Sequence, residues 1–322
     1  MIDWKEPEVD FATSIVRQAS LLSLIIEREM VAPALSKYDQ SPVTVADYAV
    51  QTLVGHAISE TFPEDPLVAE EDSSALRTED GRAVLEQVRH FISSSLPKAH
   101  PENICNWIDR GRGKCSQRFW TLDPIDGTKG FLRGDQYALA LALVVNGKLK
   151  LGVLGCPKLG PGWIITAVRG QGCWRAPLKN GNRYEPLRVS KCKDPSSAQV
   201  LRSFESKHTN EILMKKLLGE MEVQKDPLRM DSQAKYAILA EGVGDCLFRL
   251  RSPDAPDYIE KIWDHAAGTL IVEEAGGRVT DLRGNPLNFA CGELLVDNCG
   301  LLASNGLLHD AALQLLAKKS HL

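Results

Sequence analysis

The sequence contains no run of the roughly 18 consecutive apolar residues that a membrane-spanning helix requires. Its strongest apolar run, Tyr137 to Val145, has only the length of a strand. The first residues also lack the basic region and apolar stretch of a secretory signal. We therefore expect a cytoplasmic protein without a membrane partner; an organellar form whose transit peptide has been removed is the alternative.

The sequence also lacks closely spaced cysteines and an excess of basic over acidic residues. The eight cysteines form no Cys-x-x-Cys motif in a chain long enough to fold without disulfides, so we expect mostly reduced thiols. Because 38 Lys and Arg face 42 Asp and Glu, the formal net charge is −4, which argues against a nucleic-acid partner. An apolar fraction of 43% excludes a disordered chain.

The length of 322 residues corresponds to about two domains, and the pattern of predicted helices and strands changes near residue 186. Apolar spacing predicts helices over residues 10–31, 45–61, 83–92, 210–218, 231–241 and 262–275. Strands are predicted over residues 137–145, 149–156, 163–168, 172–175, 199–204, 246–250 and 278–280. We therefore predict a hairpin-rich α+β domain over residues 1–187 and an α/β domain over residues 188–322.

The segment from Asp123 to Phe131, DPIDGTKGF, follows an apolar stretch and is rich in oxygen ligands. It offers two carboxylates, the carbonyl of Ile125 and a hydroxyl, a set that suits a hard cation such as Mg²⁺. The amides after Gly127 would open a helix whose N-terminus attracts phosphate. The alternative is an ordinary turn, because Asp-Pro and Asp-Gly are common turn dipeptides.

Three further acids occupy positions where either a site or a local structural role is expected. Glu70 ends the apolar run 67–69, and its alternative is a solvated acid. Asp264 falls in the first turn of the predicted helix 262–275, where the helix dipole alone would favour it. Asp47 follows Thr44 at the spacing of a helix-capping box.

Four motifs in order along most of the chain carry a family resemblance. They are PVTVADY at 42–48, VAEEDSS at 68–74, DPIDGTKGF at 123–131, and WDHAAG at 263–268 with EAGG at 274–277. Together they resemble the lithium-sensitive, magnesium-dependent phosphomonoesterase superfamily that includes inositol monophosphatases. The segments 231–236 and 260–265 are similar to one branch, the plant and fungal 3′(2′),5′-bisphosphate nucleotidases. The resemblance implies a layered α/β/α/β/α sandwich.

The resemblance also implies the residues that carry the chemistry. The metal ligands would be Glu70, Asp123, the Ile125 carbonyl, Asp126 and Asp264. Asp47 and Thr128 would orient and deprotonate the attacking water. The implied cofactors are two or three Mg²⁺ ions, with inhibition by Li⁺. Carboxylates that converge on one cleft would repel each other without such cations.

The residues that the resemblance assigns to the substrate come mainly from the second half of the chain. They are Gly127, Thr128, His208, Ser232, Lys235, Arg249 and Asp264. Ser232 can equally cap the predicted helix 231–241, and His208 can equally be a surface residue. Arg249 lies in an otherwise apolar strand, where a guanidinium needs an anionic partner; this favours a role with phosphate.

Residues 76–118 combine one predicted helix with a polar loop that matches none of the four motifs. The loop includes the basic stretch 110–114, which could touch a second phosphate; a solvated insertion is the alternative that we favour.

We predict an enzyme that acts on a small-molecule substrate and exists as a monomer. It would convert adenosine 3′,5′-bisphosphate to AMP and phosphate, and would also accept the 2′,5′ isomer and 3′-phosphoadenosine 5′-phosphosulfate. One alternative is an inositol (poly)phosphate 1-phosphatase that uses the same metal chemistry. A non-enzymatic alternative is a sensor that binds bisphosphate nucleotides without turnover.

Overall fold

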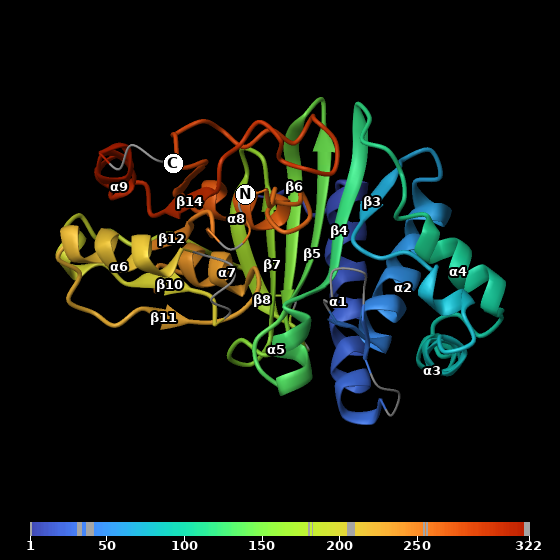
Figure 1. Cartoon of the computed structure of the whole chain (residues 1–322). Coiled ribbons are helices and arrows are strands. Elements are labelled where there is room, and N and C mark those ends of the chain that lie inside the picture. Colours follow the sequence, from blue (N-terminus) through green and yellow to red (C-terminus); the bar gives the residue numbers. More distant parts are fainter. Residues whose placement is uncertain are drawn as a thin grey trace.

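The computed structural model describes residues 2–30, 34–36, 42–179, 181, 183–204, 210–253, 255 and 257–318. Two β-sheets dominate these residues, and a small ribbon pairs β1 (Leu35–Ser36) with β2 (Pro42–Val43). Figure 1 shows the two sheets with helices before, between and beyond them.

The larger sheet has the strand order β3-β4-β5-β6-β7-β8-β9. Its strands are β3 (Leu67–Ala69), β4 (Arg118–Asp126), β5 (Ala138–Val145), β6 (Lys148–Cys156), β7 (Trp163–Val168), β8 (Gly172–Pro177) and β9 (Glu185–Pro186). Only β3 and β4 pair in parallel; the other neighbours are antiparallel. Asn146 and Gly147, both at positive φ, make the tight turn between β5 and β6.

The smaller sheet has the order β11-β10-β12-β14-β13. Its strands are β10 (Val200–Arg202), β11 (Leu228–Arg229), β12 (Cys246–Arg249), β13 (Arg278–Thr280) and β14 (Leu301–Ser304). β10 runs parallel to β11 and β12, whereas β14 is antiparallel to β12 and β13.

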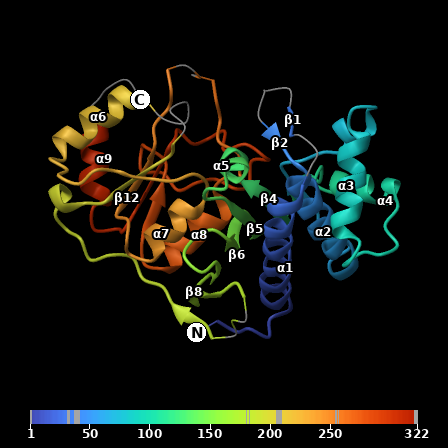
Figure 2. The same cartoon turned by 90° about the horizontal axis from the view of Figure 1, so that it is seen from below.

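Helices separate and cover the two sheets. They are α1 (Pro7–Glu29), α2 (Val45–Thr61), α3 (Arg82–Ile92), α4 (Pro101–Asp109), α5 (Thr128–Arg133), α6 (Glu211–Glu220), α7 (Ala234–Ala240), α8 (Ala266–Glu274) and α9 (His309–Ala317). α1 and α2 cover one face of the larger sheet, α7 and α8 lie between the sheets, and α6 and α9 cover the outer face of the smaller sheet (Figures 1 and 2). The predicted α/β/α/β/α sandwich is confirmed.

α1 is long and apolar enough to cross a membrane by length and composition alone. In the fold it packs on α2 and β6, and more than half of its most apolar window is buried. Val16 and Ile26 are almost fully buried in the core that this helix shares with the larger sheet. This is the packing of an amphipathic core helix.

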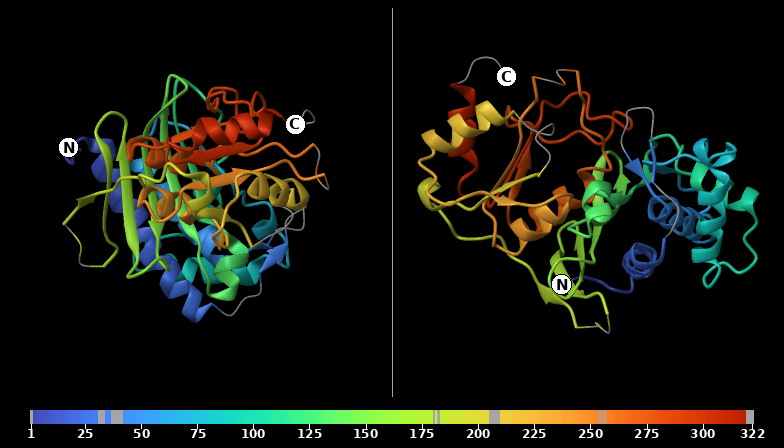
Figure 3. Two further views of the ribbon diagram at one scale, coloured as in Figure 1. Left: turned by 90° about the vertical axis from the view of Figure 1, so that its left-hand side faces the viewer. Right: turned by 60° about the horizontal axis from the view of Figure 1, so that its bottom comes forward.

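The layer of α7 and α8 joins the two halves of the sequence. α8 packs on β6 although the two are more than a hundred residues apart, and both contribute to one hydrophobic core. Gly152 of β6 lies against α8 so closely that an added Cβ would stand 2.9 Å from the Ala267 carbonyl oxygen. Figure 3 shows the same layers from two other directions.

Most predicted helices and strands are present, but α7 begins at Ala234 instead of residue 231, and two further predictions were wrong. α8 begins at Ala266 instead of residue 262, because the backbone before it bonds to a distant loop: Ile262 N–H donates to Glu293 O at 3.0 Å. Asp264 therefore precedes the helix. The polar segment before β4 contains α4, which begins with Pro101 at its first position and buries Ile104 and Ile108.

Candidate active site

A cleft of about 1160 Å³ collects most of the site residues predicted from the sequence. Its lining comes from the ends of β3 and β4, the start of α5, the start of α7, β12 and the segment before α8. Asp47 does not line the cleft and lies behind it, fully buried in the first turn of α2.

Carboxylates from separate segments meet in the cleft. Because β3 and β4 are parallel, Glu70 after β3 and Asp123 and Asp126 at the end of β4 leave the sheet at the same edge. Asp264 joins them from the turn before α8. Burial raises the pKa of Asp123 well above its usual value, and the charges of Glu70 and Asp126 raise it further. Burial and the charge of Asp126 likewise raise the pKa of Asp264.

A bulge at Pro124 and Ile125 sets the spacing of the two β4 acids. The pairing of β4 with β5 shifts between Asp123 and Asp126, where Pro124 lacks the N–H that a regular ladder needs. Gly127 follows at φ +87°, and a Cβ there would come within 3.0 Å of the Ser232 Cβ. A glycine is thus required both for its conformation and for the close approach of Ser232.

The donor set fits a hard divalent cation. Asp123 Oδ1 is buried and has no hydrogen-bond partner among the described residues. Carboxylates that are buried together raise each other's pKa, and a bound cation would remove that repulsion. The metal ligands expected from the sequence, Glu70, Asp123, Ile125, Asp126 and Asp264, all line the cleft.

Thr128 lies between Asp47 and the β4 bulge. Its Oγ1 is 3.4 Å from Asp47 Oδ1 and 3.1 Å from the carbonyl oxygen of Ile125. The other carboxylate oxygen, Asp47 Oδ2, accepts from the backbone N–H and the hydroxyl of Thr44 at 2.8 and 2.7 Å. The capping box and the Asp47–Thr128 contact, which were alternatives from the sequence, exist together.

A second wall of the cleft carries the cations. Burial lowers the pKa of Lys235 to about 8, although the charge of Asp126 opposes this, and its Nζ donates to the carbonyl of Met230. Ser232 has φ +65°, and its Oγ accepts from the N–H of Ala234, the first residue of α7, at 3.1 Å; Ser232 also lines the cleft. A non-glycine residue at positive φ is uncommon and often marks a functional site.

Arg249 has an anionic partner within the chain, which the sequence did not reveal. Its Nη2 donates to Glu260 Oε2 at 2.7 Å and its Nε to Glu260 Oε1 at 3.3 Å. Burial opposes the charged forms, but the pair holds the pKa of Glu260 below and that of Arg249 above its usual value. Burial in an apolar strand alone therefore does not demand a phosphate partner for Arg249.

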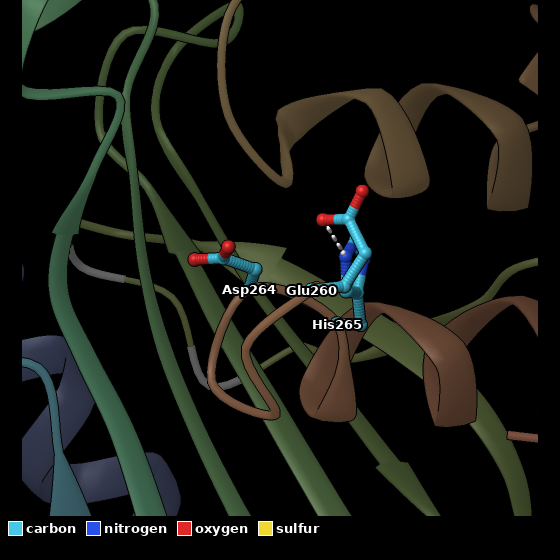
Figure 4. A group of neighbouring side chains, drawn as sticks. All are labelled: Glu260, Asp264 and His265. Carbon is cyan, nitrogen blue, oxygen red and sulfur yellow. Dashed lines mark hydrogen bonds and ion pairs between the residues drawn. The ribbon is translucent and has the colours of Figure 1, made fainter. Parts of the chain in front are cut away.

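Glu260, Asp264 and His265 lie close enough to suggest a metal site, with ligand atoms within 4.8 Å of one another. Glu260 is already bound to Arg249, and His265 Nε2 contacts Glu260 Oε2 at 2.9 Å. Figure 4 shows the carboxylate of Asp264 pointing away from the Glu260–His265 pair. We therefore assign Asp264 to the acids around Asp126 rather than to a separate metal centre.

Two further residues matter to the site but were not identified from the sequence. Gln233 N–H donates to Asp126 Oδ2 at 2.6 Å, and its side chain bonds to Trp263 O and Gly268 N–H, so it ties the acids to α7 and α8. Asp231 pairs with Arg133 of α5. Both lie beside Ser232, but only their long-range partners reveal their importance.

The basic stretch 110–114 is not simply a solvated insertion. Gly111 O accepts from Ala69 N–H at 2.8 Å, and Gly113 N–H donates to Leu67 O, so the stretch follows β3. Arg112 lines the cleft and pairs with Asp72. His208, expected at the substrate from the resemblance, lies outside the described residues.

Curated relatives are similar over nearly the whole chain. A Dictyostelium discoideum protein named 3′(2′),5′-bisphosphate nucleotidase is 40% identical over 321 residues, which cover 95% of each chain. Proteins of the same name from Schizosaccharomyces pombe and Oryza sativa are 39% and 40% identical, and the matches cover 93% and 92% of this chain and 92% and 90% of those proteins.

Solved structures show the same fold at lower identity. The Bartonella henselae extragenic suppressor protein suhB matches with a TM-score of 0.68 at 21% identity over 97% of this chain and 98% of that one. The Thermotoga maritima IMPase matches with a TM-score of 0.66 at 23% identity over 97% of both chains. A family model described as the inositol monophosphatase family matches residues 5–321. The chain belongs to the inositol monophosphatase family.

Proposed function

We propose that the chain is a Mg²⁺-dependent phosphatase that removes the 3′-phosphate of adenosine 3′,5′-bisphosphate and releases AMP. The observation that carries the proposal is a single cleft lined both by the acids Glu70, Asp123 and Asp126 and by the cations Lys235 and Arg249. Carboxylates of this kind can hold the Mg²⁺ ions that the reaction uses. Fixed cations can bind a second phosphate group on the substrate. The names of the relatives from Dictyostelium, fungi and rice support the same substrate.

The acids would hold two or three Mg²⁺ ions. The proposed ligands are Glu70, Asp123, the carbonyl of Ile125, Asp126 and Asp264. When bound, the ions would lower the pKa of a bound water and stabilise the leaving oxygen. We also propose that Li⁺ inhibits the enzyme by competing at one of these positions.

Thr128 and Asp47 would prepare the attacking water. The Thr128 hydroxyl has one proton and two acceptors within reach, Asp47 Oδ1 and Ile125 O. Donation to Asp47 leaves the oxygen lone pairs of Thr128 able to accept a hydrogen bond from water, and the water proton can move to Thr128 as the Thr128 proton moves to Asp47. The two hydrogen bonds from Thr44 fix the Asp47 carboxylate in that position. Together the pair would orient the water and take up its proton.

The second wall would hold the phosphate that does not react. Lys235 and Arg249 are cations that line the cleft, and Ser232 adds a hydroxyl beside them. Gly127, Thr128 and Asp264 would contact the substrate near the reacting phosphate. Inositol monophosphate has no second phosphate for these cations, whereas the 2′,5′ isomer and 3′-phosphoadenosine 5′-phosphosulfate both carry an anion at the 5′ end; we propose that both are accepted.

Phosphate release from three substrates tests the proposal. Purified protein with Mg²⁺ should release phosphate much faster from adenosine 3′,5′-bisphosphate than from AMP or inositol 1-phosphate. Faster release from inositol 1-phosphate would instead support an inositol (poly)phosphate 1-phosphatase. Tight binding of the bisphosphate without release would support a sensor, a function that does not require the Asp47–Thr128 pair.

We further propose a cytoplasmic monomer. All eight cysteines are unpaired, and burial raises the thiol pKa of Cys156, Cys173 and Cys246 in the core. Unpaired thiols suit a reducing compartment. Gel filtration with light scattering tests the monomer, and fractionation of cells tests the compartment.

A further inference from the structure

Four polar side chains form a continuous hydrogen-bonded path from α7 to β12: Tyr236 and His265 are buried, and Glu260 and Arg249 are 13% exposed. Tyr236 OH is 2.8 Å from His265 Nδ1, and His265 Nε2 is 2.9 Å from Glu260 Oε2. Glu260 accepts two hydrogen bonds from Arg249. We call Tyr236, His265 and Glu260 the Arg249 support.

The hydrogen bonds of the support use both nitrogens of the His265 ring. Nδ1 bonds to the Tyr236 hydroxyl, Nε2 bonds to Glu260, and the Glu260 carboxylate accepts from Arg249. The ring of Tyr236 is itself held by α8, because a Cβ at Gly268 would lie 2.4 Å from its Cδ2. The support is therefore fixed at both ends.

Arg249 needs such a support because competing acids are near. Asp126 and Asp264 both lie within electrostatic reach of its guanidinium. A long, flexible side chain would be drawn toward those carboxylates unless a closer partner held it. Glu260 engages one edge of the guanidinium, which carries five N–H donors in a rigid fork.

The support also connects residues from two elements. Tyr236 follows Lys235 in α7, and Ser232 lies just before that helix, whereas Arg249 ends β12. A link from Tyr236 to Arg249 therefore fixes the distance between the Lys235 and Arg249 cations.

We propose that Glu260, His265 and Tyr236 are positioning residues that hold Arg249 in register with Lys235, so that the cleft selects substrates with a second phosphate. This inference rests on the proposed function. It assigns selectivity, rather than the reaction itself, to a chain of residues that needs no contact with the substrate.

The test compares two substrates that differ only in the second phosphate: adenosine 3′,5′-bisphosphate and adenosine 3′-monophosphate. Glu260→Gln keeps the shape but removes the charge, and we expect it to raise the KM ratio of bisphosphate to monophosphate about tenfold, with a smaller effect on kcat. Tyr236→Phe acts at the far end and should raise this ratio about threefold. The double variant should lose little more than Glu260→Gln alone, because both act through one chain.

Glu211→Gln is the matched control. Glu211 pairs with Arg202, a buried arginine on the neighbouring strand β10, and neither residue lines the cleft. Loss of that carboxylate should destabilise the fold without changing the KM ratio. Thermal unfolding of all variants separates loss of folded protein from loss of selectivity.

Several outcomes would overturn the inference. One is an equal loss of kcat/KM on both substrates in Glu260→Gln, which would indicate a disturbed reaction centre. Another is a KM ratio that Glu260→Gln leaves unchanged. If the effects of Glu260→Gln and Tyr236→Phe on the KM ratio are additive in the double variant, the two residues do not act through one hydrogen-bonded path. If the wild-type protein releases phosphate from neither nucleotide, the proposed function itself fails and the inference falls with it.

Discussion

The two walls of the cleft are built on different principles. One wall, here called the acid wall, carries Glu70, Asp123 and Asp126. It concentrates like charges, and burial together with their mutual repulsion raises the pKa of Asp123. The wall that carries Arg249 pairs opposite charges, and Glu260 compensates its guanidinium within the chain. The first wall is incomplete without a cation, whereas the second is satisfied by partners within the chain.

This difference indicates that the two walls have separate functions. A group of acids that needs a cation can bind metal and support the reaction. Cations that are held by internal partners are preorganised. Such side chains lose little conformational entropy when they bind a phosphate. Changes in the first wall should therefore affect turnover, and changes in the second should affect the choice of substrate.

The largest effect is expected behind the acid wall. Asp47→Asn should lower kcat by about 10³-fold, because the amide cannot take up the proton that Thr128 passes on from water, while KM changes little. Steady-state kinetics and thermal unfolding measure both consequences. A variant that unfolds easily but has normal activity per folded molecule would show that Asp47 only caps α2.

Variants of its partner supply the control for that prediction. Thr128→Ser keeps the hydroxyl and should retain most activity, whereas Thr128→Ala removes it and should lose about 10²-fold in kcat. Equal activity in the two variants would exclude a role for this hydroxyl.

The next effect concerns the second wall. Arg249→Lys keeps the charge but removes the fork that bonds to Glu260, so KM for adenosine 3′,5′-bisphosphate should rise about tenfold. KM for adenosine 3′-monophosphate should rise far less. A loss of kcat with unchanged KM would contradict the division between the walls.

A substitution in the layer between the sheets should weaken both walls together. A Cβ at Gly268 would clash with the ring of Tyr236, so Gly268→Ala should lower the free energy of unfolding by about 1–3 kcal/mol. Gly219→Ala is the control, since nothing lies within 4 Å of its added Cβ and it sits in helix α6. Chemical denaturation of both variants measures the difference; equal stabilities would argue against tight packing at Gly268.

The smallest effect on activity lies outside both walls, at His309 in α9. Burial, aided by the charge of Arg278, lowers the pKa of this residue from 6.5 to about 4. The unfolded chain therefore binds a proton that the folded chain does not, and stability should fall as the pH decreases from about 6.5 to 4. His309→Gln should reduce this slope in urea denaturation across that range; an unchanged slope would contradict the assignment.

The sequence predicted what depends on neighbours in the chain. The spacing of apolar residues predicted the bounds of α2, and the residue types from Asp123 to Gly127 were enough to indicate a set of oxygen ligands. Asp47 was ambiguous because a capping box and a catalytic carboxylate share one local pattern; the contact with Thr128, 81 residues away, supports the proposed catalytic role.

The support of Arg249 could not be predicted, because Glu260 follows β12 through a loop whose course no periodicity records. The start of α8 was misplaced for a similar reason, since Glu293 holds the backbone of Ile262 out of the helix. Pairings between distant segments thus account for these two failures.

The identity of the nucleotide product tests the division between the walls most directly. Phosphorus NMR of the reaction with adenosine 3′,5′-bisphosphate distinguishes the two monophosphates that can form. If the acid wall holds the 3′-phosphate and the wall of Lys235 and Arg249 holds the 5′-phosphate, the product is adenosine 5′-monophosphate. Accumulation of adenosine 3′-monophosphate would contradict the account.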